Sequence, residues 1–333
     1  MSLTTLDTPA DGSKGADDGD GSPEVAGRSL WQITRARVRR DRTAMVCVWI
    51  LVAFYVVAIL APLIMSVLGI DPYELDGSSI SDSAGAPYGT WGGISREHLL
   101  GVEWGTGRDI LAQLLNGLRI SLFIATVATV ATVVIGTVLG IISGYVGGAT
   151  DAIIGRTIDL IIAFPFLLLI LALSGVLTQR LVDLGIPDKN ARIYYLIIVL
   201  SVFGWTYLAR VIRGQVLSLR EREFVESSVA MGSGTPRILF REILPNLWAP
   251  ILVYATLTLP AYIGTEAALA FLGVGVLPPD VTFGAMLANS VSYFNVVPSY
   301  LFIPGTLLAV LVVAFNLLGD AVRDALDPRA GRV

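Results

Sequence analysis

Two acidic residues lie in apolar stretches of this chain, where their chemistry stands out. Asp159 belongs to "IDLIIAFPFLLL" and Glu266 to "EAALAFLGVGVLPP". A carboxylate is costly in hydrocarbon, so such a group usually faces a bundle interior or a water-filled path. Arg156 stands one helical turn before Asp159 and can pair with it, which favours a structural role there. Glu266 either lines a translocation path, with Tyr262 nearby, or hydrogen-bonds a neighbouring helix.

The residues needed for metal or nucleotide chemistry are scarce. His98 is the only histidine and Cys47 the only cysteine, so neither has a second histidine or cysteine with which to complete a metal site. A phosphate-binding loop needs a glycine-rich turn followed by Gly-Lys-Ser/Thr, and the only lysines are Lys14 in "GSKGA" and Lys189 in "PDKNA". We therefore expect no metal, no cofactor and no ATP site on this chain.

A charged segment, "FVESSVAMGSGTPRILFREILPN" at 224–246, interrupts the apolar sequence. Its first part predicts a short helix closed by Gly232 in a left-handed conformation. A second helix is expected to begin with Thr235 as N-cap and Pro236 at its first position, and to end before Pro245. Two short helices with a charged rim and an apolar centre indicate a docking element of fixed shape.

The elements that must position these residues are membrane-spanning helices. Of the 333 residues, 54% are hydrophobic and only 15% are charged, which indicates an all-α, polytopic membrane protein rather than a soluble domain. A helix needs roughly 20 mostly apolar residues to cross a bilayer. Six stretches meet this requirement: 45–69, 119–145, 155–177, 192–212, 248–273 and 300–319.

The amino-terminal residues predict the orientation. Residues 1–27 are rich in Gly, Asp and Ser and are expected to be a disordered acidic tail. Residues 28–44 hold six arginines interleaved with apolar residues, which suits an interfacial helix on anionic lipid or an ordinary positive flank of the first span. Arginines gather on the same side as this cluster, so both termini, including the tail 326–333, are expected to be cytoplasmic.

Two further features complete the expected organisation. An extracytoplasmic loop at 70–118 separates the first span from a core at 119–325, in which 221–247 forms the cytoplasmic docking segment. Gly136, Gly140 and Gly144 recur every four residues and predict one smooth helix face for close packing by a neighbouring helix.

The docking segment resembles the coupling segment of binding-protein-dependent ABC importers. The family pattern is Glu-Ala-Ala, three residues, Gly, and an ending like Ile-x-Leu-Pro; here serines replace both alanines, and Glu242 stands where the peptide branch usually has histidine. Matching or adjoining positions are Glu226, Ser227, Ser228, Gly232, Pro236, Arg237, Glu242, Leu244, Pro245 and Asn246. By this resemblance, the segment docks into a groove of a separate ATPase subunit.

Other motifs are similar to the dipeptide, oligopeptide and nickel permeases. "HLLGVEWGTGRDIL" resembles their outer signature, with Val102 and Glu103 in place of Thr-Asp and one extra residue before Gly107. The matching residues of this outer motif are His98, Gly101, Gly107, Arg108 and Asp109. "IDLIIAFPFLLL", "EAALAFLGVGVLPP" and "FNLLGDAVRDALDPR" also look like this family, and several of the motifs favour its second, C-type subunit.

The resemblance implies a type I ABC importer permease in a bacterial inner membrane. Implied partners are a homologous B-type permease, two ATPase subunits that hold ATP and magnesium, an extracytoplasmic substrate-binding protein and membrane lipid, but no nucleic acid. Di- or oligopeptides are the expected substrates, and Glu266 would then be placed to meet a peptide's amino group. Nickel or another small solute stays open, and an ion-coupled secondary transporter using Asp159 and Glu266 is the competing class.

Overall fold

The computed structural model describes residues 36–81, 85–89, 91–276 and 278–326. The expected acidic tail 1–27, the first part of the basic stretch 28–44 and all but the first residue of the tail 326–333 lie outside these residues. Within them, the only regular secondary structure longer than a single β-bridge is helical. The fold class expected from composition is therefore confirmed.

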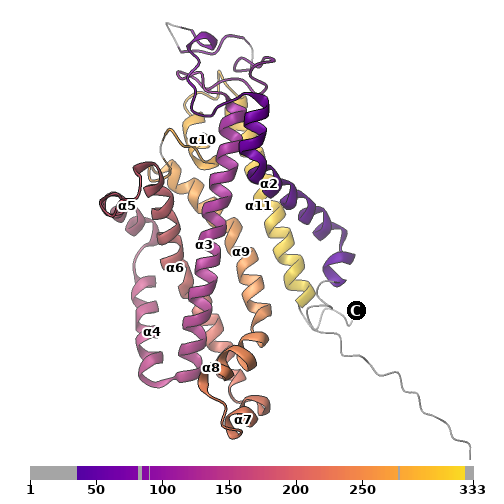
Figure 1. The fold of residues 1–333 in the computed structure, drawn as a ribbon, viewed down its shortest axis with the longest axis vertical. Helices are drawn as coiled ribbons and strands as arrows, with labels where there is room; N and C mark the ends of the chain where they lie inside the picture. Colours follow the sequence, from indigo (N-terminus) through magenta and orange to yellow (C-terminus); the bar gives the residue numbers. More distant parts are fainter. Residues whose placement is uncertain (1–35, 82–84, 90, 277, 327–333) are drawn as a thin grey trace, which may run out of the picture.

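Six helices of the described part are long and apolar enough to cross a membrane. The first, α2, begins where Asp41 caps the backbone N–H groups of Thr43 and Ala44. In Figure 1, α2 runs beside α11, and Nη1 of Arg37, just before α2, donates to the carbonyl oxygen of Ala325 in the last turn of α11 at 3.2 Å. The six helices are α2 (Arg42–Leu68), α3 (Ile110–Val146), α5 (Phe166–Asp183), α6 (Asp188–Leu219), α9 (Trp248–Phe271) and α11 (Ser299–Leu326).

The third span differs from the expected single helix over 155–177. The chain forms α4 (Gly148–Ala163) and then α5, with a break at Phe164 and Pro165. Phe164 is extended, with φ −85° and ψ 135°, because the ring of the following proline disfavours the α conformation there. The continuous prediction was wrong because it counted apolar residues and gave this proline no weight.

The region around the start of α3 and the end of α9 is more ordered than a loop. The last residues of the predicted loop 70–118 already belong to α3, which begins at Ile110 after the N-cap Asp109. The stretch between α9 and α11, which lies between two of the predicted spans, contains α10 (Phe283–Ser290), whose first turn is capped by Thr282. A single 3₁₀ turn, η1 (Gly77–Ser79), lies between α2 and α3.

The glycine stripe packs α3 against α6, as the four-residue spacing predicts. A Cβ atom on Gly140 would lie 2.8 Å from the carbonyl oxygen of Ala209, and one on Gly144 would lie 2.8 Å from Cβ of Val216. These distances are too short for any side chain without movement of the neighbouring helix. The two helices lie side by side at the centre of the molecule (Figure 1), and their contact depends on these glycines.

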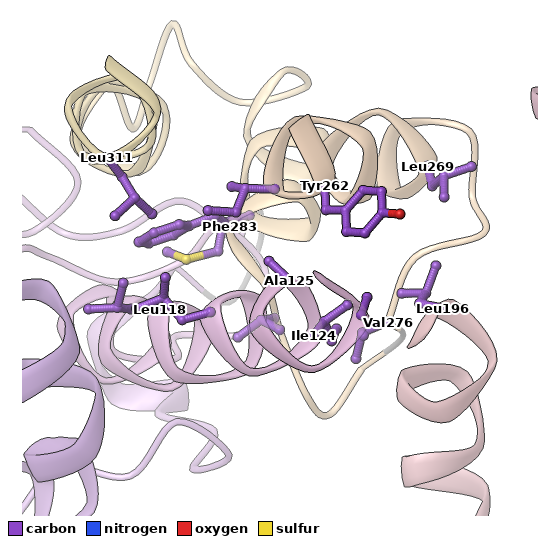
Figure 2. Packing of buried hydrophobic residues seen from close by; sticks show 14 of the residues in the cluster. Leu118, Ile124, Ala125, Leu196, Tyr262, Leu269, Val276, Phe283 and Leu311 are labelled. Atoms are coloured by element: carbon purple, nitrogen blue, oxygen red, sulfur yellow. The ribbon is translucent and has the colours of Figure 1, made fainter. Parts of the chain in front are cut away.

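The main apolar core surrounds the N-terminal half of α3. Leu118, Ile124 and Ala125 of α3 pack with residues of α6, α9, α10 and α11. Figure 2 shows Phe283 and Tyr262 between α3 and the helices that cover it, with Leu311 of α11 approaching from the side. A second cluster packs the C-terminal parts of α3 and α6 and the start of α9 against the docking segment.

Candidate functional site

The docking segment forms a helix, a glycine corner and a second helical stretch. The first helix is α7 (Glu223–Ala230), and Gly232 follows with φ +76°, the left-handed conformation that the sequence predicts. The second stretch comprises α8 (Thr235–Arg237), a π-helical turn, η2 (Ile238–Ile243), and a 3₁₀ turn, η3 (Leu244–Asn246). Gly234, not Thr235, occupies the N-cap, and the helical path continues through Pro245 instead of ending before it.

One side of the segment is fixed to the membrane helices. Val225, Ile238 and Ile243 are at most 2% exposed and belong to the cluster formed with the C-terminal parts of α3 and α6 and the start of α9. Ser228 is buried on the same side, and Leu244 and Glu242 are half-buried. These contacts reach three of the long helices, so the segment is packed directly against α3, α6 and α9.

The opposite side is open and partly apolar. Met231 is 77% and Phe240 64% exposed, and the exposed Phe224 and Val229 belong to the same two-helix unit. The remaining motif residues, Glu226, Ser227, Gly232, Pro236, Arg237 and Pro245, are also exposed. Large apolar side chains with a polar rim on a water-facing surface are typical of a protein interface. The sequence analysis did not distinguish these exposed apolar side chains from the buried Val225, because helical spacing alone does not tell which face of a helix is covered.

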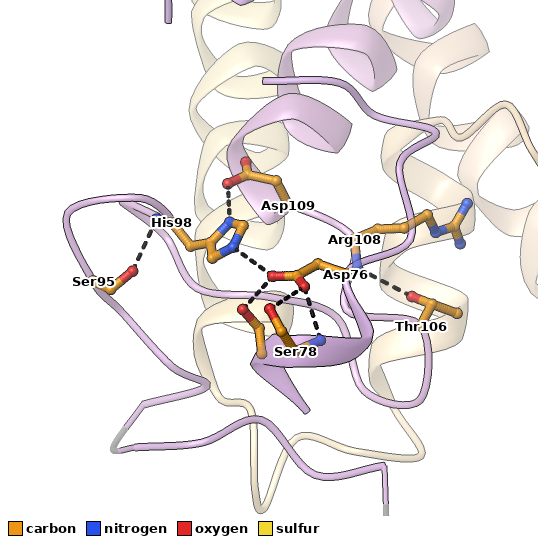
Figure 3. Close-up of polar contacts among 8 residues, drawn as sticks. Asp76, Ser78, Ser95, His98, Thr106, Arg108 and Asp109 are labelled. Carbon is orange, nitrogen blue, oxygen red and sulfur yellow. Dashed lines mark hydrogen bonds and ion pairs between the residues drawn. The ribbon is translucent and has the colours of Figure 1, made fainter. Parts of the chain in front are cut away.

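The outer motif forms a compact group of hydrogen bonds at the beginning of α3 (Figure 3). Nδ1 of His98 lies 2.8 Å from Asp109, which caps α3 through the N–H of Ala112. Nε2 of His98 lies 3.3 Å from Asp76, a residue at the N-cap of η1. Thus His98 joins the loop after α2 to the first turn of α3, and Asp76 is a partner that the sequence analysis did not identify.

A buried ion pair lies beside this group. Nε of Arg108 donates to a carboxylate oxygen of Glu103 at 2.7 Å, and both side chains are 7% exposed. The hydroxyl of Tyr300 donates to the other oxygen at 2.9 Å, so α11 is tied to the same carboxylate. Gln113 of α3 also donates to Glu103. The substitution of Glu for the family's Asp therefore falls on the centre of this network.

The glycines of the outer motif permit close backbone contacts. Gly101 has φ +85°, and a Cβ atom there would lie 2.4 Å from the carbonyl oxygen of Gly92. Gly107 has φ +69°, and a Cβ atom there would lie 2.0 Å from the carbonyl oxygen of Asp76. Both positions exclude a side chain by conformation and by space. The motif is in this way a framework that fixes the loop to the helices.

The electrostatics of this group follow from its two carboxylates. Partial burial lowers the pKa of His98, but the hydrogen bonds and charges of Asp109 and Asp76 outweigh burial and raise the pKa above its ordinary value. Hydrogen bonds from Ser78, Ser79 and His98 hold the pKa of Asp76 well below its usual range. The two carboxylates therefore favour the protonated form of His98 more than water does for a free imidazole.

Glu266 and Tyr262 lie inside the helix bundle. Glu266 is 1% exposed and accepts hydrogen bonds from Ser121 of α3, at 3.2 Å, and from Thr282, at 2.6 Å. The Tyr262 hydroxyl donates to the carbonyl oxygen of Leu200 at 2.9 Å and lies 2.7 Å from the hydroxyl of Thr132. Of the two roles that the sequence allows for Glu266, this geometry is that of a hydrogen bond to a neighbouring helix.

Asp159 pairs with a different arginine from the one expected. Its Oδ1 lies 2.7 Å from Nη2 of Arg210 on α6, whereas the sequence suggested Arg156 on its own helix. Local spacing identified a possible partner but not the packing of α4 against α6, which brings Arg210 closer. A second pair joins the same two helices nearer the C-terminal end of α6, where Arg213 donates to both carboxylate oxygens of Asp151, at 2.6 and 2.8 Å.

Comparison with known proteins decides the family. Residues 136–332 match the model for the binding-protein-dependent transport system inner membrane component, and residues 29–85 match the N-terminal TM domain of oligopeptide transport permease C. The chain belongs to this family of permeases. A permease of this family is the non-catalytic, multi-pass inner-membrane component of its transporter, and it works with a binding protein and an ATPase.

The permease has close curated relatives. It is 36% identical over 301 residues to the oligopeptide transport system permease protein OppC of Bacillus subtilis, with 90% of each chain covered. It is 35% identical over 301 residues, with the same coverage, to the dipeptide transport system permease protein DppC of Alkalihalophilus pseudofirmus. The Escherichia coli OppC is 33% identical over 306 residues, covering 92% of this chain and 93% of the relative.

The permease fold also occurs in a solved transporter. A chain from an inward-facing structure of the MetNI methionine ABC transporter superposes on this chain with a TM-score of 0.52 and 21% identity. The match covers 66% of this chain and 98% of the transporter chain. At this identity the likeness supports the fold alone. The resemblance drawn from the coupling segment and the outer motif is thus confirmed at the level of family.

Proposed function

We propose that this permease is the C-type subunit of an ABC importer for di- or oligopeptides. The observation that carries the proposal is the joint match to the N-terminal domain of oligopeptide permease C and to curated peptide permeases over about nine-tenths of the chain. In this complex it pairs with a homologous B-type permease to form the path. The peptide arrives from an extracytoplasmic binding protein.

The coupling step belongs to the segment 221–247. The segment is held by Val225, Ile238 and Ile243 on the membrane side and presents Met231 and Phe240 on the open side. Docking of the open side into an ATPase subunit buries this apolar surface. Closure of two ATPase subunits around ATP and magnesium would then displace the segment and tilt α3, α6 and α9 with it.

The proposed orientation has the docking segment and both termini in the cytoplasm, with the outer motif on the other side. Three arginines of the segment, Arg222, Arg237 and Arg241, agree with the tendency of cytoplasmic segments to be positively charged. The outer loop would face the binding protein.

The proposal is tested by purifying the complex and measuring uptake. The purified permease should bring with it a second permease and two ATPase chains, and proteoliposomes should take up labelled trialanine only with the binding protein and ATP. A variant of the partner's ATP site should abolish uptake. Uptake that persists in that variant but collapses with an ionophore would contradict the proposal and favour an ion-coupled transporter.

A further inference from the structure

An ion pair between two membrane helices lies on an exposed surface of the permease. The side chains of Asp159 and Arg210 are 62% and 48% exposed, although their charged groups are only 2.7 Å apart. Large exposed neighbours on the same helices include the apolar Leu160, at 61%, and the aromatic Tyr207, at 61%, while the exposed Arg156 lies one turn before Asp159 on α4. Charged groups on membrane helices rarely face lipid and usually border a water-filled path or a protein partner.

A cavity adjoins this ion pair on the side away from the docking segment. It has a volume of about 380 Å³ and lies at the break between α4 and α5. Arg210 follows the cavity residue Tyr207 by one helical turn, and Asp159 precedes the cavity residue Ile161 by two positions. The pair therefore stands at the rim of the cavity that is nearer the cytoplasm.

The cavity wall is mostly aromatic. Phe164, Phe166 and Phe203 line it, and the rings of the last two meet edge to face with centroids 6.0 Å apart. Tyr254 also lines it, with its hydroxyl already bonded to the carbonyl oxygen of Gly204. A wall of ring surfaces with few free polar groups accepts apolar side chains of different shapes without demanding one sequence.

The exposed pair has the charges that a zwitterionic ligand requires. A free peptide carries one ammonium and one carboxylate group, and Asp159 and Arg210 offer one complementary charge to each. We infer that the aromatic cavity and the Asp159–Arg210 pair form a transient binding site for zwitterionic peptides within the path. In the empty site the two side chains neutralise each other; when a peptide passes, each exchanges its partner for a peptide terminus. This inference rests on the proposed peptide-import function.

The first test removes the charges one by one and together. Complexes reconstituted with binding protein, ATP and labelled trialanine are compared for uptake and for ATP hydrolysis. In Asp159→Asn, in Arg210→Gln and in the double variant, uptake should fall by about tenfold or more while co-purification of the ATPase chains is unchanged. Arg156→Gln is the matched control, because this exposed arginine lies on α4 one turn from Asp159 and makes no ion pair within the described residues; its uptake should be retained.

The double variant separates a binding role from a structural one. With both charges gone, no unpaired charge remains, so a pair that serves only folding or lipid contact predicts restored uptake. Restored uptake in the double variant, or equal loss in Arg156→Gln, would overturn the inference. Absence of ATP-driven uptake in the wild-type complex would instead contradict the proposed function itself, so the two failures are distinguishable.

A second test measures whether this surface meets water. In a Cys47→Ala background, Tyr207→Cys should react with a membrane-impermeant thiol reagent during ATP turnover, and trialanine-loaded binding protein should slow the reaction. Val176→Cys, an equally exposed position on the apolar helix α5, is the control and should stay unreactive. Equal lack of reaction at both positions would show that the α4 and α6 surface faces lipid and would overturn the inference.

Discussion

The hydroxyl of Thr282 donates a hydrogen bond of 2.6 Å to Glu266, and the same oxygen accepts the backbone N–H of Ala285 at 3.1 Å. One side chain thus links a buried carboxylate of α9 to the first turn of α10. Ser121 of α3 forms the other half of this arrangement, since it donates to Glu266 and accepts the N–H of Phe283. Three helices therefore meet at one acidic residue.

The Thr282→Val variant should destabilise this meeting point. Valine keeps the shape but removes both the helix cap and one donor to the carboxylate, at a cost of about 1–3 kcal/mol. The thermal unfolding midpoint of the purified complex should fall. Thr265→Val is the control, because Thr265 bonds only to the Ala261 carbonyl of its own helix. An unchanged midpoint in Thr282→Val would show that these hydrogen bonds do not hold α10.

Substitution of Gly232 should weaken attachment of the ATPase. A Cβ there meets open space, so the effect of Gly232→Val comes from the left-handed φ of +76°, which costs a side-chain-bearing residue about 1–2 kcal/mol. Gly232→Asn is the matched control, since asparagine tolerates this conformation. We expect reduced co-purification of ATPase chains and reduced uptake in the valine variant only.

Arg237→Gln should change ATPase attachment much less, because exposed ion pairs contribute only about 0–1 kcal/mol. The permease itself should insert normally in all three variants. Full ATPase recovery and normal uptake in Gly232→Val would show that this segment is not the coupling element.

A methyl group on the glycine stripe should disturb the packing of α3 and α6. In Gly140→Ala the new Cβ would lie 2.8 Å from the Ala209 carbonyl oxygen, and overpacking of this kind costs about 1–3 kcal/mol. Gly155→Ala on α4 is the control: its Cβ would meet no atom within 4 Å, so this change should be neutral or slightly stabilising. Thermal unfolding in detergent compares the two, and equal midpoints would contradict the close packing.

The outer loop should be held more firmly at acidic than at alkaline pH. The folded-state pKa of His98 is raised, so its stabilising contribution is complete below the unfolded pKa and is lost as pH rises through the folded pKa. Hydrogen exchange of residues 91–109 should therefore be slower at pH 5.5 than at pH 8.5, after correction for intrinsic rates. His98→Gln should remove most of this difference, and an unchanged difference would assign it to other groups.

Labelling of introduced cysteines tests the orientation. The variants Tyr88→Cys and Met231→Cys are made in a Cys47→Ala background. These two positions suit labelling because the native side chains are 59% and 77% exposed. A membrane-impermeant maleimide should label the first from outside the cell and the second only after the membrane is opened. Labelling of both from one side would contradict the six-span arrangement.

The parts of the fold that the sequence predicted are those set by local patterns. Apolar length located the spanning helices except the third, which is broken at Pro165. The spacing of Gly136, Gly140 and Gly144 predicted a contact face, and Gly232 predicted a left-handed corner. Contacts between distant segments were missed. Nothing near Asp159 in the sequence points to Arg210, fifty-one residues away, and nothing near Glu103 points to Tyr300. Such pairs depend on how helices pack, which helical periodicity does not specify.

The helices of the permease divide into two mechanical kinds. α3 has 37 residues, about 55 Å at 1.5 Å per residue, and neither it nor α6 contains proline, whereas α2, α9 and α11 have Pro62, Pro260 and Pro304 in their interiors. Proline removes a helical hydrogen bond and allows bending. We therefore expect the glycine-packed α3 and α6 pair to move as one stiff unit between the outer motif and the docking segment, and bending to concentrate in the proline-containing helices.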